Sequence, residues 1–240
     1  MNVNQSKTTL ICLPFAGGSK FAFHRLEAYL SAFCQVKTIE LPGRGTRFAE
    51  PLLLSADLIV ADAWKQIRPW ITDAPYAFLG HSMGSWLTFL MAHEIRKAGL
   101  QPPSHLFLSG REAPSIPASE PPDYLLSAAA FKAKLKSYGG FDAQILENEE
   151  AYAFFEPIIR ADFQVLETWK YQPQMPLDIP ATVLSGTNED ITEAELRAWS
   201  LEFNGEIRFK KFEGDHFFLF EHAEAFSNII KQRLFEGTLN

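Results

Sequence analysis

The stretch YAFLGHSMGSWLTFLMAHEI, residues 76–95, places one serine, Ser82, between Gly80 and Gly84. An apolar run precedes this serine and a run with helical spacing follows it, so the segment predicts a strand, a tight turn and a helix over 83–98. Glycine has no side chain, and the two flanking glycines let the backbones pass closely. On such a turn the serine adopts an unfavourable backbone conformation and projects its hydroxyl above the edge of the sheet. We therefore interpret Ser82 as a candidate nucleophile rather than as an incidental turn residue.

Short apolar runs rich in β-branched and aromatic residues alternate with longer helical patterns along the rest of the chain. Near-continuous apolar strands are typical of a parallel sheet that is covered by helices on both faces. The sequence therefore predicts an α/β fold with a mostly parallel, doubly wound sheet. The expected strands lie at 8–14, 35–41, 76–80, 105–110, 181–186 and 206–212, and the expected helices at 20–32, 55–70, 83–98, 193–203 and 219–235.

One long segment, residues 112–176, interrupts this alternation. It contains no convincing strand, and its helical patterns are separated by prolines and by a YGG sequence. Residues 151–171 predict a long helix that is kinked or broken at Pro157, because proline removes a backbone N–H and clashes with the preceding turn. The segment is too long for a simple crossover and too apolar for a linker. We expect a helical lid at 112–176, inserted into a core domain formed by 1–111 and 177–240.

The chain has 240 residues and a formal net charge of −7. An acidic balance without any run of basic residues argues against a nucleic-acid binder that is held by phosphate contacts. The polar first residues lack the apolar centre of a secretory signal, and no apolar run is long enough for a membrane span. Cys12 and Cys34 are expected to be buried, unpaired thiols. These features predict a cytoplasmic protein with one large domain, and we expect a monomer.

A serine hydroxyl is a weak nucleophile unless a base takes its proton and an acid holds that base. In a sheet of this kind the order along the chain is serine, then acid, then histidine, each at the carboxyl end of a strand. Of the six histidines, His216 in FEGDHFFLF follows the last expected strand and is the candidate base. The acid is expected in LSGTNEDIT, where Glu189 and Asp190 are adjacent and only one of them can point inward. We select Asp190 over Glu189.

The negative charge that develops on an attacked carbonyl oxygen needs backbone N–H donors that are placed in advance. One expected donor is the N–H of Met83, directly after the nucleophile. The other is expected from the loop LPFAGGS, residues 13–19, which two glycines allow to bend back over the serine. We select Ala16 as this second donor, with Phe15 as the alternative.

Eight motifs occur in order and at compatible spacing over nearly the whole chain: LPFAGGS (13–19), LPGRGTRFAEP (41–51), GHSMGSWLTFLMAHEI (80–95), LFLSGREAP (106–114), LKSYGGF (135–141), IIRADFQVLETWKYQP (158–173), LSGTNEDIT (184–192) and FEGDHFFL (212–219). In this combination the chain resembles the stand-alone, or type II, thioesterases of non-ribosomal peptide and polyketide synthase pathways, which belong to the α/β-hydrolase superfamily. The sequence departs from the family at EDI, where Asp-Pro is more frequent, and at Glu112, where a basic residue is common.

The resemblance implies an α/β-hydrolase fold with a mobile lid at 112–176, and Ser82, Asp190 and His216 as nucleophile, acid and base. It further implies hydrolysis of acyl thioesters from the phosphopantetheine arm of acyl carrier or peptidyl carrier domains, which restores blocked carriers. A thioester is already activated, so such a site needs no metal and no cofactor, and the phosphopantetheine belongs to the substrate.

Carrier proteins are usually acidic, and because this chain is acidic too, docking would need a local basic patch. The candidates are Arg44 and Arg47, with Lys20 or Arg25 nearby. Solvated surface arginines, or a structural PGRG turn, are an equal alternative. Two other functions share the same three catalytic residues, namely a carboxylesterase for small free esters and an acyltransferase. A non-catalytic binding protein is disfavoured because all three residues are present.

Overall fold

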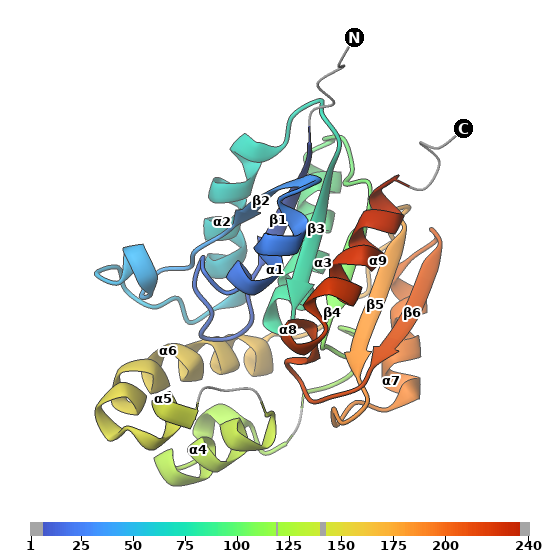
Figure 1. Cartoon of the computed structure of the whole chain (residues 1–240). Helices are drawn as coiled ribbons and strands as arrows, with labels where there is room; N and C mark the ends of the chain where they lie inside the picture. The colour runs from blue at the N-terminus through green and yellow to red at the C-terminus, as the bar shows by residue number, and fades with distance from the viewer. Residues whose placement is uncertain (1–6, 119, 140–142, 236–240) are drawn as a thin grey trace.

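The computed structural model describes residues 7–118, 120–139 and 143–235 of the chain (Figure 1). Its centre is one six-stranded sheet with the order β2-β1-β3-β4-β5-β6, in which every neighbouring pair of strands is parallel. The strands are β1 (Thr8–Leu13), β2 (Cys34–Thr38), β3 (Tyr76–His81), β4 (Leu106–Ser109), β5 (Ala181–Gly186) and β6 (Ile207–Phe212). All six strands were expected from the sequence, with bounds that agree to within a few residues.

Helices cover both faces of this sheet, as Figure 1 shows, with α1 and α9 on one face and α2 and α3 on the other. The α-helices are α1 (His24–Leu30), α2 (Ala56–Ile67), α3 (Met83–Lys97), α4 (Ala128–Ser137), α5 (Ala143–Glu147), α6 (Glu149–Thr168), α7 (Glu193–Arg197), α8 (Phe218–Glu221) and α9 (Ala223–Phe235). Short 3-10 helices are η1 (Gly45–Arg47), η2 (Arg68–Trp70), η3 (Asp123–Leu125) and η4 (Ala198–Glu202). The expected doubly wound α/β-hydrolase architecture is confirmed.

The two covered faces explain why the strands read as continuous apolar runs. Successive side chains of a strand point to opposite faces. In β1, Leu10 and Cys12 pack into the cluster beneath α1 and α9, whereas Ile11 and Leu13 pack into the cluster beneath α2 and α3. All four are fully buried, and each large aliphatic side chain contributes about 1.5–3 kcal/mol to folding. If polar and apolar residues alternated along a strand, the polar side chains would lie in one of the two apolar cores.

Helices α4, α5 and α6 come from the segment between β4 and β5 and lie together below the sheet at the lower left of Figure 1. They form a small apolar cluster of their own, which includes Phe131, Leu135 and Tyr152. The carboxyl half of α6 differs, since Val165 joins the main core. Helix α6 continues across the exposed Pro157, so of the two expected alternatives the break is wrong, and the kink stays a prediction. The lid boundaries 112 and 176 stay a prediction.

The two cysteines are buried and unpaired, as expected. Burial raises the pKa of both thiols, and that of Cys34 reaches about 12. Neither thiol is therefore ionised near neutral pH, and both act as small apolar side chains beneath α1. Within the described ranges, no helix combines the length and the apolar character that crossing a bilayer requires.

Candidate active site

Ser82 lies at the corner between β3 and α3 and is the only non-glycine residue of the described ranges with a positive φ. Its φ of 55° and ψ of −118° are a sparsely populated conformation that costs about 1–3 kcal/mol. The backbone N–H of Ser82 donates to the Ser109 carbonyl on β4 over 2.7 Å, and this bond helps to hold the corner. Ser82 is the N-cap residue of a 15-residue helix, without a capping side-chain hydrogen bond, so it lies at the positive end of that helix.

Gly80 and Gly84 are required by the close approach of three backbones. A Cβ on Gly84 would overlap the carbonyl oxygen of Leu13 on β1, and a Cβ on Gly80 would overlap the carbonyl of Gly84. The strand, the helix and β1 can therefore meet at this point only without side chains at both positions. This is the close passage that the G-x-S-x-G spacing predicted.

Ser85 is a structural residue of this corner that the sequence analysis did not identify. Its buried hydroxyl lies 3.0 Å from the Gly80 carbonyl oxygen and 2.8 Å from the Ser109 carbonyl oxygen, and it accepts the Ser109 N–H over 2.8 Å. One side chain thus joins β3, β4 and α3 directly behind Ser82. The only available signal was a second serine in the HSMGS sequence, whose partners are not visible in the sequence.

His216 lies in the loop after β6, with a side chain that is 12% exposed. Its ring centroid is 4.8 Å from that of His81, the residue before Ser82, so the candidate base lies at the same edge of the sheet as the candidate nucleophile. The His216 Nδ1 lies 2.6 Å from Oε1 of Glu189. The other carboxylate oxygen of Glu189 accepts the N–H of Gly186 over 2.6 Å. Both carboxylate oxygens are engaged, and the side chain is only 3% exposed.

The expectation that Asp190 points at His216 is wrong, because the structure places Glu189 there and leaves Asp190 exposed. Neighbouring residues of the loop point in opposite directions, as expected, so only one carboxylate can reach the ring. Glu189 takes this position because its Oε2 accepts the backbone N–H of Gly186 at the end of β5. The longer side chain of Glu189 spans the distance from the loop to the imidazole.

His81 is a buried neighbour of this pair, with 0% exposure and its Nδ1 3.0 Å from the Ser109 hydroxyl. Burial, reinforced by the nearby His216, lowers the pKa of His81 well below its ordinary value. His81 is therefore neutral at pH 7 and leaves His216 as the basic group that faces Glu189.

The loop expected to supply an oxyanion donor forms a tight turn. The Gly18 N–H donates to the Phe15 carbonyl over 2.8 Å, and Gly17 has a φ of +78°, which together are the features of a type II turn. Within the described part of the chain, the N–H groups of Ala16 and Met83 donate to no other residue. The turn adjoins the start of α3, because Gly84 packs against the Leu13 carbonyl just before it.

The segment after α4 covers His216. The His216 N–H donates to the Tyr138 carbonyl over 3.2 Å, and the two rings lie 5.3 Å apart. A Cβ on Gly139 would approach the Asp215 carboxylate to 2.6 Å, so the segment passes closely over the histidine loop. A cavity of about 280 Å³ lies elsewhere, and none of Ser82, Glu189 and His216 lines it. Its walls come from the loop after β4, the end of α6 and the aromatic residues Trp86, Trp169, Tyr171 and Trp199.

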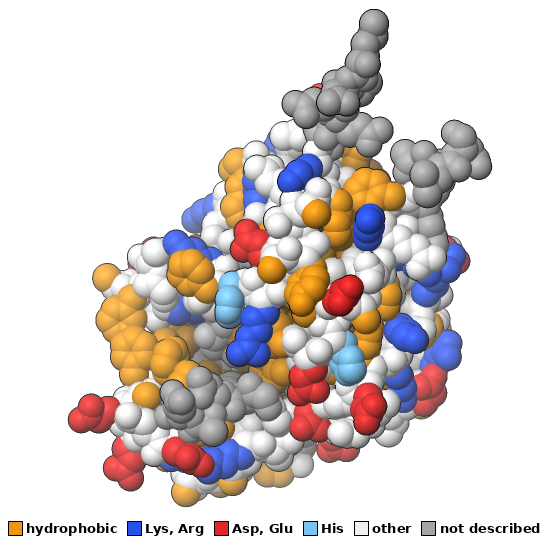
Figure 2. Space-filling model, viewed as in Figure 1, with side chains coloured by type: hydrophobic (Ala, Val, Ile, Leu, Met, Phe, Trp, Pro, Cys, Tyr) orange, Lys and Arg blue, Asp and Glu red, His pale blue; other side chains and the backbone are white. Residues whose placement is uncertain are grey.

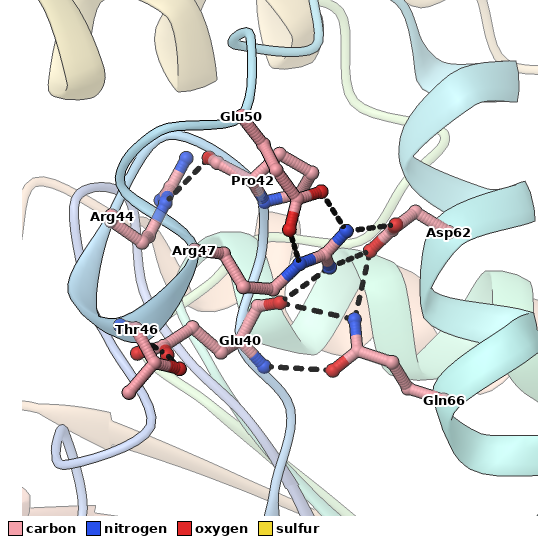
Figure 3. Close-up of polar contacts among 8 residues, drawn as sticks. All are labelled: Glu40, Pro42, Arg44, Thr46, Arg47, Glu50, Asp62 and Gln66. Carbon is pink, nitrogen blue, oxygen red and sulfur yellow. Dashed lines mark hydrogen bonds and ion pairs between the residues drawn. The ribbon is translucent and has the colours of Figure 1, made fainter.

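Two of the four expected docking side chains are engaged inside the protein. Arg44 is 5% exposed and makes two hydrogen bonds to Asp162, so its expected contact with a carrier is wrong. Figure 3 shows the guanidinium of Arg47 between Glu50 and Asp62, where it also donates to the Glu40 carbonyl. These acidic partners raise the pKa of Arg47 above its ordinary value.

Lys20 and Arg25 are the remaining two docking candidates. Lys20 is half-buried with its ammonium over the Phe21 ring, and Arg25 is exposed on α1. The contacts of Arg44 and Arg47 inside the protein favour a structural role for both arginines.

Gly110 offers a test of the close packing of His81 and Glu189 at this site. Gly110 has a φ of +65°, and a Cβ there would lie 2.6 Å from His81 and 3.3 Å from the Glu189 carboxylate. We expect Gly110→Ala to lower kcat at least about tenfold, because the added carbon displaces the His81 ring next to Ser82 and crowds the Glu189 carboxylate that orients the base. Gly99→Ala is the matched control, since Gly99 has a φ of +63° and no atom within 4 Å of the added carbon. Both variants acquire about 1–2 kcal/mol of backbone strain, so equal activities would contradict this role.

Comparison with known proteins agrees with this geometry. A family model described as a thioesterase domain matches residues 8–234. The gramicidin S biosynthesis protein GrsT of Aneurinibacillus migulanus is 37% identical over 222 residues, which cover 92% of this chain and 86% of GrsT. The type II thioesterase BorB of the borrelidin cluster superposes with a TM-score of 0.87 at 35% identity and covers 96% of this chain and 94% of BorB.

A second solved structure, ClbQ from the colibactin NRPS/PKS pathway, has a TM-score of 0.90 at 30% identity and covers 96% of this chain and 98% of ClbQ. These likenesses extend over both the sheet and the helical insertion. The family model alone accounts for nearly all of the described residues. The chain belongs to the thioesterase domain family.

Proposed function

We propose that this thioesterase is a serine hydrolase that removes acyl groups from the phosphopantetheine arm of carrier domains. The observation that carries the proposal is the strained Ser82 corner beside the paired His216 and Glu189. A nucleophile, a base and a group that orients the base are the parts that acyl transfer needs. The sequence, the fold and the family agree on the reaction class.

The reaction follows from the positions of these groups. The Ser82 hydroxyl oxygen attacks the thioester carbonyl carbon while His216 takes its proton through Nε2. The N–H groups of Ala16 and Met83 hold the oxyanion of the tetrahedral intermediate. As the intermediate collapses, the C–S bond breaks and His216 returns the proton to the departing sulfur, which leaves an acyl ester on Ser82.

Water completes the cycle. His216 takes a proton from the water as the water oxygen attacks the acyl ester. When the second tetrahedral intermediate collapses, the bond between the carbonyl carbon and Ser82 Oγ breaks, His216 returns the proton to Oγ, and the carboxylic acid leaves. Glu189 accepts the Nδ1 hydrogen bond throughout and stabilises the imidazolium when it forms. The cycle is balanced without a metal or a cofactor.

The proposed partners are acyl carrier or peptidyl carrier domains of a synthase, met in the cytoplasm by a monomer of this chain. The support comes from relatives whose names place them in biosynthesis, such as GrsT for gramicidin S and ClbQ for colibactin. On the face of the molecule that Figure 2 shows, the basic side chains are dispersed among acidic and hydrophobic ones. Docking through local contacts is therefore favoured over steering by a basic field.

Relative rates on three substrates test this proposal. We expect kcat/KM for an acetyl-phosphopantetheinyl carrier to exceed that for p-nitrophenyl acetate about 100-fold, which corresponds to about 2.7 kcal/mol of additional transition-state binding. Acetyl-pantetheine without the carrier separates thioester chemistry from docking and should fall between the two. Equal rates on the carrier and the free ester would instead favour a carboxylesterase. Formation of an ester with an added alcohol in place of the free acid would favour an acyltransferase.

A further inference from the structure

Asp162 is a fully buried carboxylate on α6, in the helical insertion. Its Oδ2 accepts the backbone N–H of Gly17 over 2.7 Å and the Arg44 guanidinium over 2.5 Å, and its Oδ1 accepts a second bond from Arg44 over 2.8 Å. The three residues of this contact come from different segments: Asp162 from α6, Gly17 from the turn after β1 and Arg44 from the loop after β2. A buried carboxylate is stable only with such a partner and such hydrogen bonds.

The Gly17 N–H belongs to the central peptide of the Phe15–Gly18 turn. The orientation of that peptide distinguishes a type II turn from a type I turn, and rotating it would bring the Ala16 carbonyl toward the carboxylate. Asp162 therefore favours one of the two turns, because it accepts an N–H and repels a carbonyl oxygen. Ile159 of α6 also packs closely on this turn, since its Cγ1 would lie 2.6 Å from a Cβ on Gly17.

The same turn fixes the direction of the Ala16 N–H. The carbonyl of Phe15 accepts the Gly18 N–H over 2.8 Å inside the turn. In a trans peptide the N–H points opposite to the carbonyl, so the Ala16 N–H points out of the turn. Both turn types keep this bond, so the turn itself sets the direction of the Ala16 N–H, while the bond from Gly17 to Asp162 ties the turn to α6 and fixes where this donor lies.

We propose that Asp162 is a positioning residue, which acts through Gly17 to hold the Ala16 N–H ready for the oxyanion. The inference rests on the proposed serine mechanism and extends it, since it makes α6 of the insertion part of the oxyanion site. Arg44 serves as the counter-charge that lets the carboxylate remain buried. A donor aimed at the transition state affects kcat rather than substrate binding.

Two double variants separate the acceptor from the charge pair. Arg44→Met/Asp162→Asn and Arg44→Met/Asp162→Leu both remove the two charges, but only the asparagine variant keeps an oxygen that can accept the Gly17 N–H. We expect the asparagine variant to keep kcat within about threefold of the wild type. The leucine variant should lose about 10- to 100-fold in kcat with little change in KM, because removing an oxyanion donor costs about 100- to 1000-fold.

A second readout distinguishes positioning from a general loss of structure. A boronic acid forms a tetrahedral adduct with Ser82, so its affinity should fall in the leucine variant by the same factor as kcat, while the affinity for the carboxylic acid product stays unchanged. Melting temperatures report whether each variant is folded. If leucine is not tolerated, Arg44→Met/Asp162→Ala removes the acceptor without adding volume.

A folded leucine or alanine variant with wild-type kcat, or with unchanged boronate affinity, would overturn the inference. The single variant Ser82→Ala in the same assay keeps this outcome separate from the proposed function. If Ser82→Ala retains turnover, the serine mechanism itself fails. If Ser82→Ala is inactive while the acceptor-free variant is fully active, only the role of Asp162 fails.

Discussion

Replacing Ser82 by alanine is expected to lower kcat on a carrier-bound acyl thioester by about 10⁴- to 10⁶-fold, since the acyl-enzyme can no longer form. His216→Ala should lose nearly as much. The double variant should be no worse than Ser82→Ala, because a base without its nucleophile contributes little. Single-turnover assays with radiolabelled acyl carrier measure all three. Additive losses in the double variant would show that the two residues do not act as one unit.

The strained backbone adds a second expectation at the same position. Ser82→Gly should be as inactive as Ser82→Ala but more stable, because glycine adopts a φ of 55° without strain. We expect a gain of up to about 1–3 kcal/mol in the free energy of unfolding, relative to Ser82→Ala. Urea denaturation of the two variants measures it. A glycine variant that is less stable than the alanine variant would mean that the corner is not a reservoir of strain.

The sheet and the serine corner could be predicted because local sequence determines them. Apolar β-branched runs gave the six strands, and Gly80, Ser82 and Gly84 form a pattern whose glycines the close backbone contacts require. His216 could be placed because it follows the last strand, and parallel strands bring their carboxyl ends to one edge. Helix α6, in contrast, runs through Pro157, because tertiary packing outweighs one missing hydrogen bond.

The errors arose where one specific contact decides the outcome, whether its partner is distant or local in the chain. Arg44 looked like a surface cation, but its partner Asp162 lies 118 residues further along the chain and buries it. The choice between two adjacent carboxylates depended on which one the Gly186 N–H holds. Composition and spacing carry no information on either contact. The turn held by Asp162 could not be predicted for the same reason.

The second large effect is expected at Glu189. Glu189→Gln should lower kcat about 10³- to 10⁴-fold, because a neutral amide can no longer stabilise the imidazolium of His216. Asp190→Asn is the matched control, since it removes the same charge from the next residue of the same loop. Asp190 is exposed, so its variant should stay within about threefold of the wild type. Steady-state kinetics on the carrier thioester at saturating substrate compares the two.

Comparing Glu189→Gln with Asp190→Asn also shows which carboxylate orients His216 during turnover, and not only in the resting protein. If Asp190→Asn lost 100-fold or more and Glu189→Gln did not, the loop after β5 would have to exchange its two carboxylates when substrate binds. The Gly186 N–H opposes such an exchange, because releasing Glu189 leaves a buried donor without an acceptor, which costs about 1–3 kcal/mol. Such an exchange would also move the exposed Asp190 carboxylate out of solvent. We therefore expect Glu189, rather than Asp190, to hold His216 through the whole reaction.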